Sequence, residues 1–143
     1  MYMADMKNPS IQGTMFEALG IIVEEAGPDK VVLTMPVGPA TRQPYGLLHG
    51  GASVALAETA ASIGAHLNAA PEGKAAVGLE INANHIKPKR DGVVRARAIP
   101  LHKGSTTMVW DIKITDEKEK LVCVSRCTMA IIDIPGGENG KFK

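Results

Sequence analysis

The chain has 143 residues, of which 45% are hydrophobic and 22% are charged. A chain of this length buries about two-thirds of its surface in one compact domain, and its ordinary apolar fraction excludes intrinsic disorder as a description of the whole. The net charge is only +1, which argues against a protein of nucleic-acid or membrane surfaces. We therefore expect a single domain over 1–143, with polar, flexible ends at 1–9 and 134–143.

The N-terminal part of the chain predicts a short helix and then a β-hairpin. Ser10 is a candidate N-cap for a helix over 10–19, which Gly20 would end. Two apolar runs, 21–26 and 31–37, are joined by a Gly-Pro-Asp-Lys turn, which is typical of a hairpin. The N-terminus shows no apolar h-region of a secretory signal, so we expect a cytoplasmic protein.

The middle of the chain is small and apolar. Residues 50–70 are rich in alanine, which predicts a helix of about twenty residues, about 30 Å long. Its charged residues are Glu58 and, when protonated, His66. A carboxylate in the middle of the segment would be costly in lipid. We therefore expect the helix to be buried inside a protein rather than to span a membrane.

The second half of the chain reads as four strands, at 76–86, 92–102, 106–115 and 121–133. The links between them are short, which predicts an antiparallel meander. The fold class expected is α+β, with a sheet of about six antiparallel strands curled around one long helix. One sheet face cannot cover the whole apolar circumference of that helix, so self-association is expected.

Motifs with a fixed mechanism are missing from the sequence. It has no phosphate loop, dinucleotide fingerprint, nucleophile elbow or C-x-x-C pair, and its four histidines lack metal-ligand spacing. We therefore expect neither a metal nor a cofactor. Cys123 and Cys127 would lie about 13 Å apart on one strand, too far for a disulfide, so both are expected to be free thiols.

Glu58 is the strongest candidate for chemistry. Burying an unpaired carboxylate costs several kcal/mol, and the residues around Glu58 offer no charged face to place it on. The alternatives are a solvent-facing stripe or a salt bridge to a strand arginine. Ser62, four residues on, shares its helical face and can hydrogen-bond the same group, but a packing role for this serine is equally plausible.

Gly50 and Gly51 begin the predicted helix. Their N–H groups lie at the positive end of the helix dipole, where they can stabilise an oxyanion; alternatively, they only let a loop turn into the helix. Gly50 and Glu58 are about 12 Å apart along the axis and rotated by about 80°. One helix cannot bring both to one carbonyl carbon, whereas two antiparallel copies in a symmetric dimer can. The sequence therefore predicts an active site shared between subunits.

Four segments together resemble the hotdog-fold acyl-CoA thioesterases: QPYGLLHGG at 43–51, AET at 57–59, GLEINANH at 78–85 and PLHKGS at 100–105. The resemblance covers about residues 15–133. It is greatest to the subgroup that acts on 1,4-dihydroxy-2-naphthoyl-CoA in menaquinone synthesis, with 4-hydroxybenzoyl-CoA and phenylacetate-pathway thioesterases as more distant relatives. The fold of that family, a sheet wrapped around one long helix, agrees with the expected architecture.

The resemblance implies a role for each site residue. Glu58 would activate water or attack the thioester carbonyl, and the Gly50 N–H would hold the thioester oxygen. Gln43 would position the acyl group or the water. His49 would orient the thioester or its loop, and Ser62 would hold the departing thiolate or the water.

The resemblance also implies the substrate contacts and the partners. The substrate is an acyl-CoA, the protein is a homodimer with shared sites and a dimer-of-dimers tetramer, and neither nucleic acid nor membrane is a partner. Cations at strand ends suit CoA phosphates, although such lysines are often only solvated. The implied contacts are Gly78, His85, Ile86, Lys87, Pro88, His102, Lys103, Gly104, Ser105, Thr106 and Thr107.

Two other functions are compatible with these residues. A hotdog hydratase or dehydratase acting on a 3-hydroxyacyl thioester also uses a histidine and an acid across a dimer, which His49 and Glu58 could imitate. A non-catalytic acyl-CoA-binding module is the third possibility, but it has little need for Glu58. The register of Gln43 and Ser62 favours the thioesterase.

Overall fold

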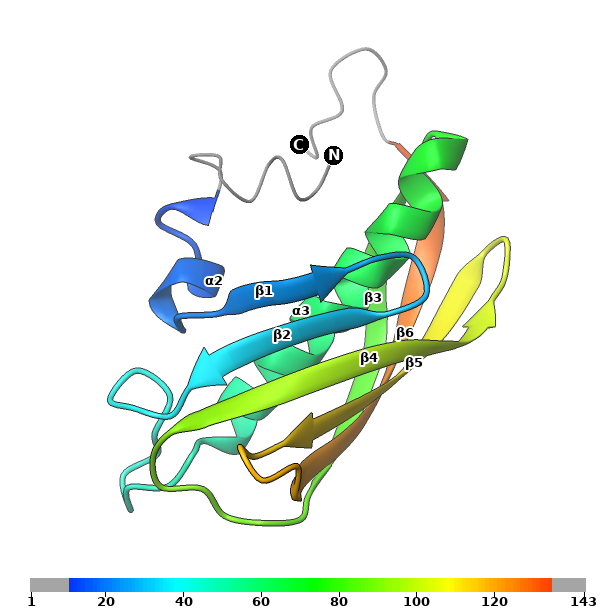
Figure 1. The fold of residues 1–143 in the computed structure, drawn as a ribbon. Helices are drawn as coiled ribbons and strands as arrows, with labels where there is room; N and C mark the ends of the chain where they lie inside the picture. Colours follow the sequence, from blue (N-terminus) through cyan, green and yellow to red (C-terminus); the bar gives the residue numbers. More distant parts are fainter. Residues whose placement is uncertain (1–10, 135–143) are drawn as a thin grey trace.

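The computed structural model describes residues 11–134, so Ser10 and almost all of the two predicted flexible ends lie outside it. One six-stranded antiparallel sheet curls around one long helix (Figure 1). This confirms the predicted α+β architecture. The elements in chain order are α2 (Met15–Ala18), β1 (Ile22–Ala26), β2 (Val31–Pro36), α3 (Gly50–Ala69), the 3-10 turn η2 (Ala70–Glu72), β3 (Lys74–His85), β4 (Val93–Lys103), β5 (Thr107–Thr115) and β6 (Leu121–Asp133).

The first predicted helix is shorter than expected. Within the described part of the predicted range, only the four residues of α2 are α-helical, with Thr14 as the N-cap. Gly13 before it has a φ of +71°, a left-handed conformation that interrupts a right-handed helix. The predicted stop is confirmed, because the φ of Gly20 is +69° and its N–H bonds to the carbonyl of Glu17.

The sheet order is β1-β2-β4-β5-β6-β3. The hairpin of β1 and β2 is confirmed, and β4, β5 and β6 form a meander. The predicted pairing of the third and fourth strands is wrong, because β3 pairs with β6 at the edge of the sheet. Instead of turning back on β3, the link at 86–92 stays against β6: the N–H groups of Ile86 and Lys87 both donate to the carbonyl of Val122.

The core lies between α3 and the inner face of the sheet. Trp110 on β5 is fully buried, as its alternation with Met108, Ile112 and Ile114 predicts. The helix approaches the sheet closely because its inward residues are small. Gly64 has no space for even one more carbon atom, since a Cβ there would lie 2.3 Å from the indole ring of Trp110. The two cysteines are buried free thiols, as predicted.

Two surfaces are left open by this packing. One stripe of α3 is only partly buried; it contains Ala55, Glu58, Thr59, Ser62 and His66. Among the described residues, the twelve-residue strand β3 pairs with β6 on one side only, and its other edge is free of any described strand. Within residues 11–134, no helix combines the length and the apolar character needed to span a bilayer.

Candidate active site

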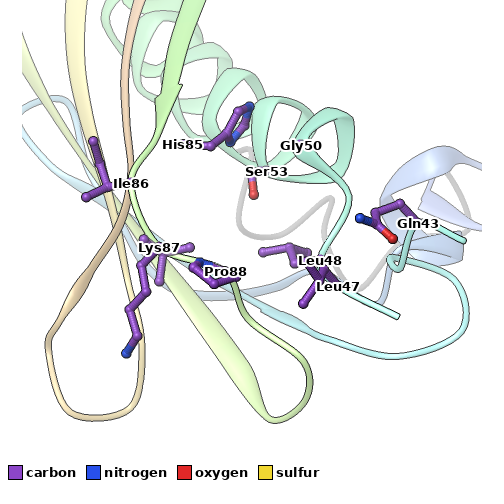
Figure 2. A pocket seen from close by; sticks show the side chains of 10 residues that line it. Gln43, Leu47, Leu48, Gly50, Ser53, His85, Ile86, Lys87 and Pro88 are labelled. Atoms are coloured by element: carbon purple, nitrogen blue, oxygen red, sulfur yellow. The ribbon is translucent and has the colours of Figure 1, made fainter. Parts of the chain in front are cut away.

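A cavity of about 330 Å³ lies at the N-terminus of α3 (Figure 2). Its walls come from the loop that precedes the helix, from the first turn of the helix, from the end of β3 and the segment that follows it, and from the start of β6. Most of the lining is aliphatic. The lining residues are Gln43, Leu47, Leu48, Gly50, Ser53, His85, Ile86, Lys87, Pro88 and Val122. The structure thus brings together Gln43, Gly50 and the predicted contact segment 85–88.

The helix begins in a way that leaves a backbone donor at the cavity. His49 is the N-cap, and its Nδ1 accepts a hydrogen bond of 2.8 Å from the N–H of Gly51. The N–H groups of a first helical turn have no partner within the helix, so that of Gly50 points out of the positive end. The His85 ring packs closely on Gly50, because a Cβ at position 50 would lie 2.8 Å from Nε2 of His85 and would force the ring to shift.

Gln43 is held in place by its own loop. Its Oε1 accepts a hydrogen bond of 2.5 Å from the N–H of Tyr45, and its own N–H donates to the carbonyl of Leu47. The side-chain NH₂ group is therefore the part of Gln43 that can meet a bound molecule.

Lys87 lines the cavity, but its charge is already neutralised. Its Nζ lies 2.5 Å from Oδ2 of Asp116, a residue that is only 5% exposed. The hydrogen bond from Lys87, together with those from the N–H groups of Lys120 and Lys118, lowers the pKa of Asp116 to about 2. Lys89 forms a similar pair with Glu117 at 2.7 Å. These lysines fix the link after β3 to the turn between β5 and β6.

Glu58 lies outside this cavity. Its Oε1 faces Gly78 so closely that a Cβ there would be 2.6 Å away. Gly78 stands at a β-bulge of β3, where the register against β6 shifts between Gly78 and Glu80. Burial first, and then the nearby negative charges of Glu58 and Glu80, raise the pKa of the Cys127 thiol to about 12. Within one chain, Gly50 and Glu58 therefore do not converge.

The second predicted contact segment, 102–107, lies at the other end of the sheet. His85 is opposite Cys123 on β6, whereas Thr107 is opposite Ala130. Seven residues of strand separate the two positions, or about 23 Å. The Nζ of Lys103 lies 2.5 Å from Oδ1 of Asp29. One chain does not bring the two segments together.

Four cavity residues were missed by the sequence analysis. Leu47, Leu48 and Val122 resemble ordinary core residues, and only the folded geometry directs them at a cavity. In the sequence, Ser53 looks like one more small residue of an alanine-rich helix. Its position four residues, or one helical turn, after His49 was the only signal that it could face the same site. No group of three or more possible metal ligands gathers within residues 11–134.

The model of the thioesterase superfamily matches residues 45–123, more than half of the chain. The chain belongs to this superfamily. It is an enzyme of the thioesterase class with the hotdog fold, as the sequence predicted.

Known members of the superfamily resemble the chain along most of its length. The 1,4-dihydroxy-2-naphthoyl-CoA hydrolase of Escherichia coli is 51% identical over 85% of this chain and 88% of its own. The crystal structure of a Haemophilus influenzae thioesterase matches with a TM-score of 0.85 and 45% identity, over 93% of this chain and 92% of that one.

A Staphylococcus aureus relative has been solved as two alanine variants, one at a glutamine and one at a glutamate. The glutamate variant matches with a TM-score of 0.79 and 44% identity, over 82% of this chain and 98% of that one. The two substituted residues are fifteen positions apart in the S. aureus protein.

Proposed function

We propose that this enzyme hydrolyses aromatic acyl-CoA thioesters to the free acid and CoA, with 1,4-dihydroxy-2-naphthoyl-CoA or a similar compound as the substrate. The identity to the E. coli hydrolase supports this substrate class, and an aliphatic cavity of about 330 Å³ has room for an aromatic ring. The biological setting that follows is menaquinone synthesis in the cytoplasm.

The reaction needs two groups at one thioester carbon. The Gly50 N–H donates to the carbonyl oxygen as negative charge develops there. The carboxylate of Glu58 either takes a proton from the attacking water or attacks the carbon itself, and CoA leaves as a thiolate. Because a thiolate is a good leaving group, little acid assistance is needed. Gln43 orients the acyl group or the water, His49 holds the helix terminus, and Ser62 lies four residues from Glu58 on the same open stripe.

A second subunit is required for these groups to meet. Glu58 lies on the open stripe of α3, outside the cavity of its own chain, and β3 offers a free edge beside it. In a homodimer that covers these two surfaces, each subunit supplies Glu58 to the cavity of the other. Dimers would pair into a tetramer, which also provides a route for segment 102–107 to reach a CoA held at 85–88.

The S. aureus variants support the choice of residues. Gln43 and Glu58 are separated by fifteen positions, the same separation as the glutamine and the glutamate that were replaced there. The observation that carries the proposal is the cavity itself, in which the Gly50 N–H meets an aliphatic space at the positive end of a helix.

The first test is a thiol-trapping assay with benzoyl-CoA, a hydroxynaphthoyl-CoA and a straight-chain acyl-CoA. Wild-type enzyme should release thiol fastest from the aromatic substrates, and Glu58→Ala should lower kcat by about a hundredfold or more. The ranking of the substrates checks the acyl preference. Thiol release that is unchanged in Glu58→Ala would contradict the assignment of Glu58, and double-bond formation would indicate the dehydratase.

Subunit complementation tests the shared site. Gln43→Ala and Glu58→Ala chains are each expected to be nearly inactive, but when they are co-expressed, half of the dimers are mixed and each mixed dimer has one intact site. The mixture should recover about a quarter of wild-type activity. No recovery, although mass spectrometry detects the mixed dimer, would place Gln43 and Glu58 of one chain in the same site.

A further inference from the structure

The cavity contains one polar group that the proposed mechanism does not use. Ser53, in the first turn of α3, is only 1% exposed and lines the cavity. Figure 2 shows its hydroxyl directed from the helix toward the space between Leu48 and the segment 85–88. This hydroxyl is surrounded mainly by aliphatic side chains.

Within residues 11–134, no hydrogen bond occupies this hydroxyl. A serine or threonine inside a helix usually donates to the carbonyl four residues earlier. Thr59 in the same helix does so, with a bond of 2.6 Å to the carbonyl of Ala55. The hydroxyl of Ser53 faces the cavity instead, so it is free to hydrogen-bond a molecule that binds there.

Two other polar groups of the cavity already have partners within the chain. The Nζ of Lys87 is paired with Asp116, and Oε1 of Gln43 accepts from Tyr45. The ring of His85 packs against Gly50. The hydroxyl of Ser53 can serve a bound molecule both as a donor and as an acceptor, in addition to the Gln43 NH₂ group and the Gly50 N–H.

We propose that Ser53 determines specificity: its hydroxyl hydrogen-bonds an oxygen substituent of the bound acyl group, so that hydroxylated acyl thioesters are preferred over their unsubstituted counterparts. This inference rests on the proposed function, because it places the acyl group in this cavity. A site built to hydrogen-bond a substrate hydroxyl discriminates against the analogue that lacks it, since its own buried group is then left unpaired.

The experiment compares kcat/KM for benzoyl-CoA with kcat/KM for 2-, 3- and 4-hydroxybenzoyl-CoA. In wild-type enzyme, at least one hydroxylated isomer should be preferred. Ser53→Ala should lower kcat/KM for that isomer about tenfold, while kcat/KM for benzoyl-CoA stays within about twofold. The position of the preferred hydroxyl then shows which ring carbon faces Ser53.

Ser125→Ala is the matched control. Ser125 is also 1% exposed, but its hydroxyl donates to the carbonyl of Asn82 on the other strand of its pair. This substitution should lower stability and leave the substrate ratio unchanged. Ser53→Ala should keep the melting temperature, because alanine favours a helix and no bond within the chain is lost.

Two results would overturn the proposal: a Ser53→Ala variant that changes all four substrates by the same factor, or one with a melting temperature several degrees lower. If wild-type enzyme releases no thiol from any substrate, the proposed function fails instead. Calorimetric Kd values for the same four thioesters then decide the role of Ser53. Equal losses of affinity for all four in Ser53→Ala would contradict it, and a loss confined to the hydroxylated ligands would support it.

Discussion

The carboxylate of Glu58 lies where it does because Gly78, which faces it, has no side chain. Gly78 sits at a bulge of β3, and Oε1 of Glu58 occupies the space where a Cβ at position 78 would be. The bulge bends the strand locally, and glycine lets the carboxylate lie directly on its backbone. Gly78 on β3 therefore determines where the carboxylate of Glu58 on α3 can lie.

Gly78→Ala should misplace the Glu58 carboxylate. A Cβ at 2.6 Å forces Oε1 to move, and a misplacement of about 1 Å can cost about a hundredfold in rate. We expect kcat to fall by about ten- to a hundredfold, with a smaller change in KM, as measured by the thiol-trapping assay. In a Glu58→Asp background the side chain is shorter, so Gly78→Ala should cost much less there.

Gly38→Ala is the control, because a Cβ at Gly38 has open space and a φ that any residue adopts. It should leave kcat and KM at their wild-type values. If Gly78→Ala costs as much in the Glu58→Asp background as it does alone, the two residues do not act through one another.

At the scale of elements, α3 depends on small residues to lie close to the sheet. Gly64 is the extreme case, since the indole of Trp110 occupies the position of its Cβ. The indole N–H of Trp110 is buried and has no hydrogen-bond partner among the described residues. The ring therefore contributes packing rather than a polar contact.

Gly64→Ala should destabilise the fold, although alanine favours helices by about 1 kcal/mol over glycine. Forcing a carbon into the indole costs about 1–3 kcal/mol, so urea denaturation should show a lower midpoint with an unchanged slope. Trp110→Phe removes the outer ring atoms that the new carbon meets. The double variant should lose less stability than the sum of the two single variants, and strict additivity would rule out this contact.

The sequence predicted most elements, because their signals are local. The strand boundaries follow from period-two alternation, as in Met108 to Ile114, and the ends of α3 follow from composition and its flanking glycines. The partner of β3 could not be predicted, because it depends on where the link at 86–92 is held. Ion pairs from Lys87 and Lys89 to the β5–β6 turn hold that link, and such long-range contacts leave no periodic pattern in the sequence.

The candidate site, too, was predicted only where its residues give a local signal in the sequence. Glu58 is visible in the sequence as a charge among alanines, and Gly50 as a glycine at a helix start. Ser53 is not visible, because its missing hydrogen bond is a property of the folded chain. Segments 85–88 and 102–107 were both predicted to contact CoA, and one chain keeps the two segments apart.

At the scale of the whole molecule, the buried Asp116 makes the free energy of unfolding depend on pH. Its pKa of about 2 lies below the ordinary value of 3.8, first because Lys87 donates to it and then because two backbone N–H groups do. As pH falls, the unfolded chain therefore takes up this proton before the folded chain does. The stabilisation is complete above about pH 4 and is lost as pH falls toward 2.

Asp116→Asn should flatten this part of the stability profile. The free energy of unfolding, measured by urea titration between pH 5 and about 2, should fall less steeply in the variant, and the variant should be less stable than wild type at pH 7. Equal slopes in the two proteins would mean that Asp116 titrates alike in the folded and unfolded chains.

The origin of the cavity walls has a consequence for evolution. Apart from Gly50 and Ser53 on α3, and His85 at the end of β3, the lining comes from the loop before α3, from the link after β3 and from the start of β6. Replacing Leu47, Leu48 or Ile86 reshapes the cavity without touching the small residues that seat α3 on the sheet. Selection can therefore change the acyl group that is accepted by changing loops. Descendants of one ancestral chain can acquire different substrates while keeping the same scaffold and the same carboxylate.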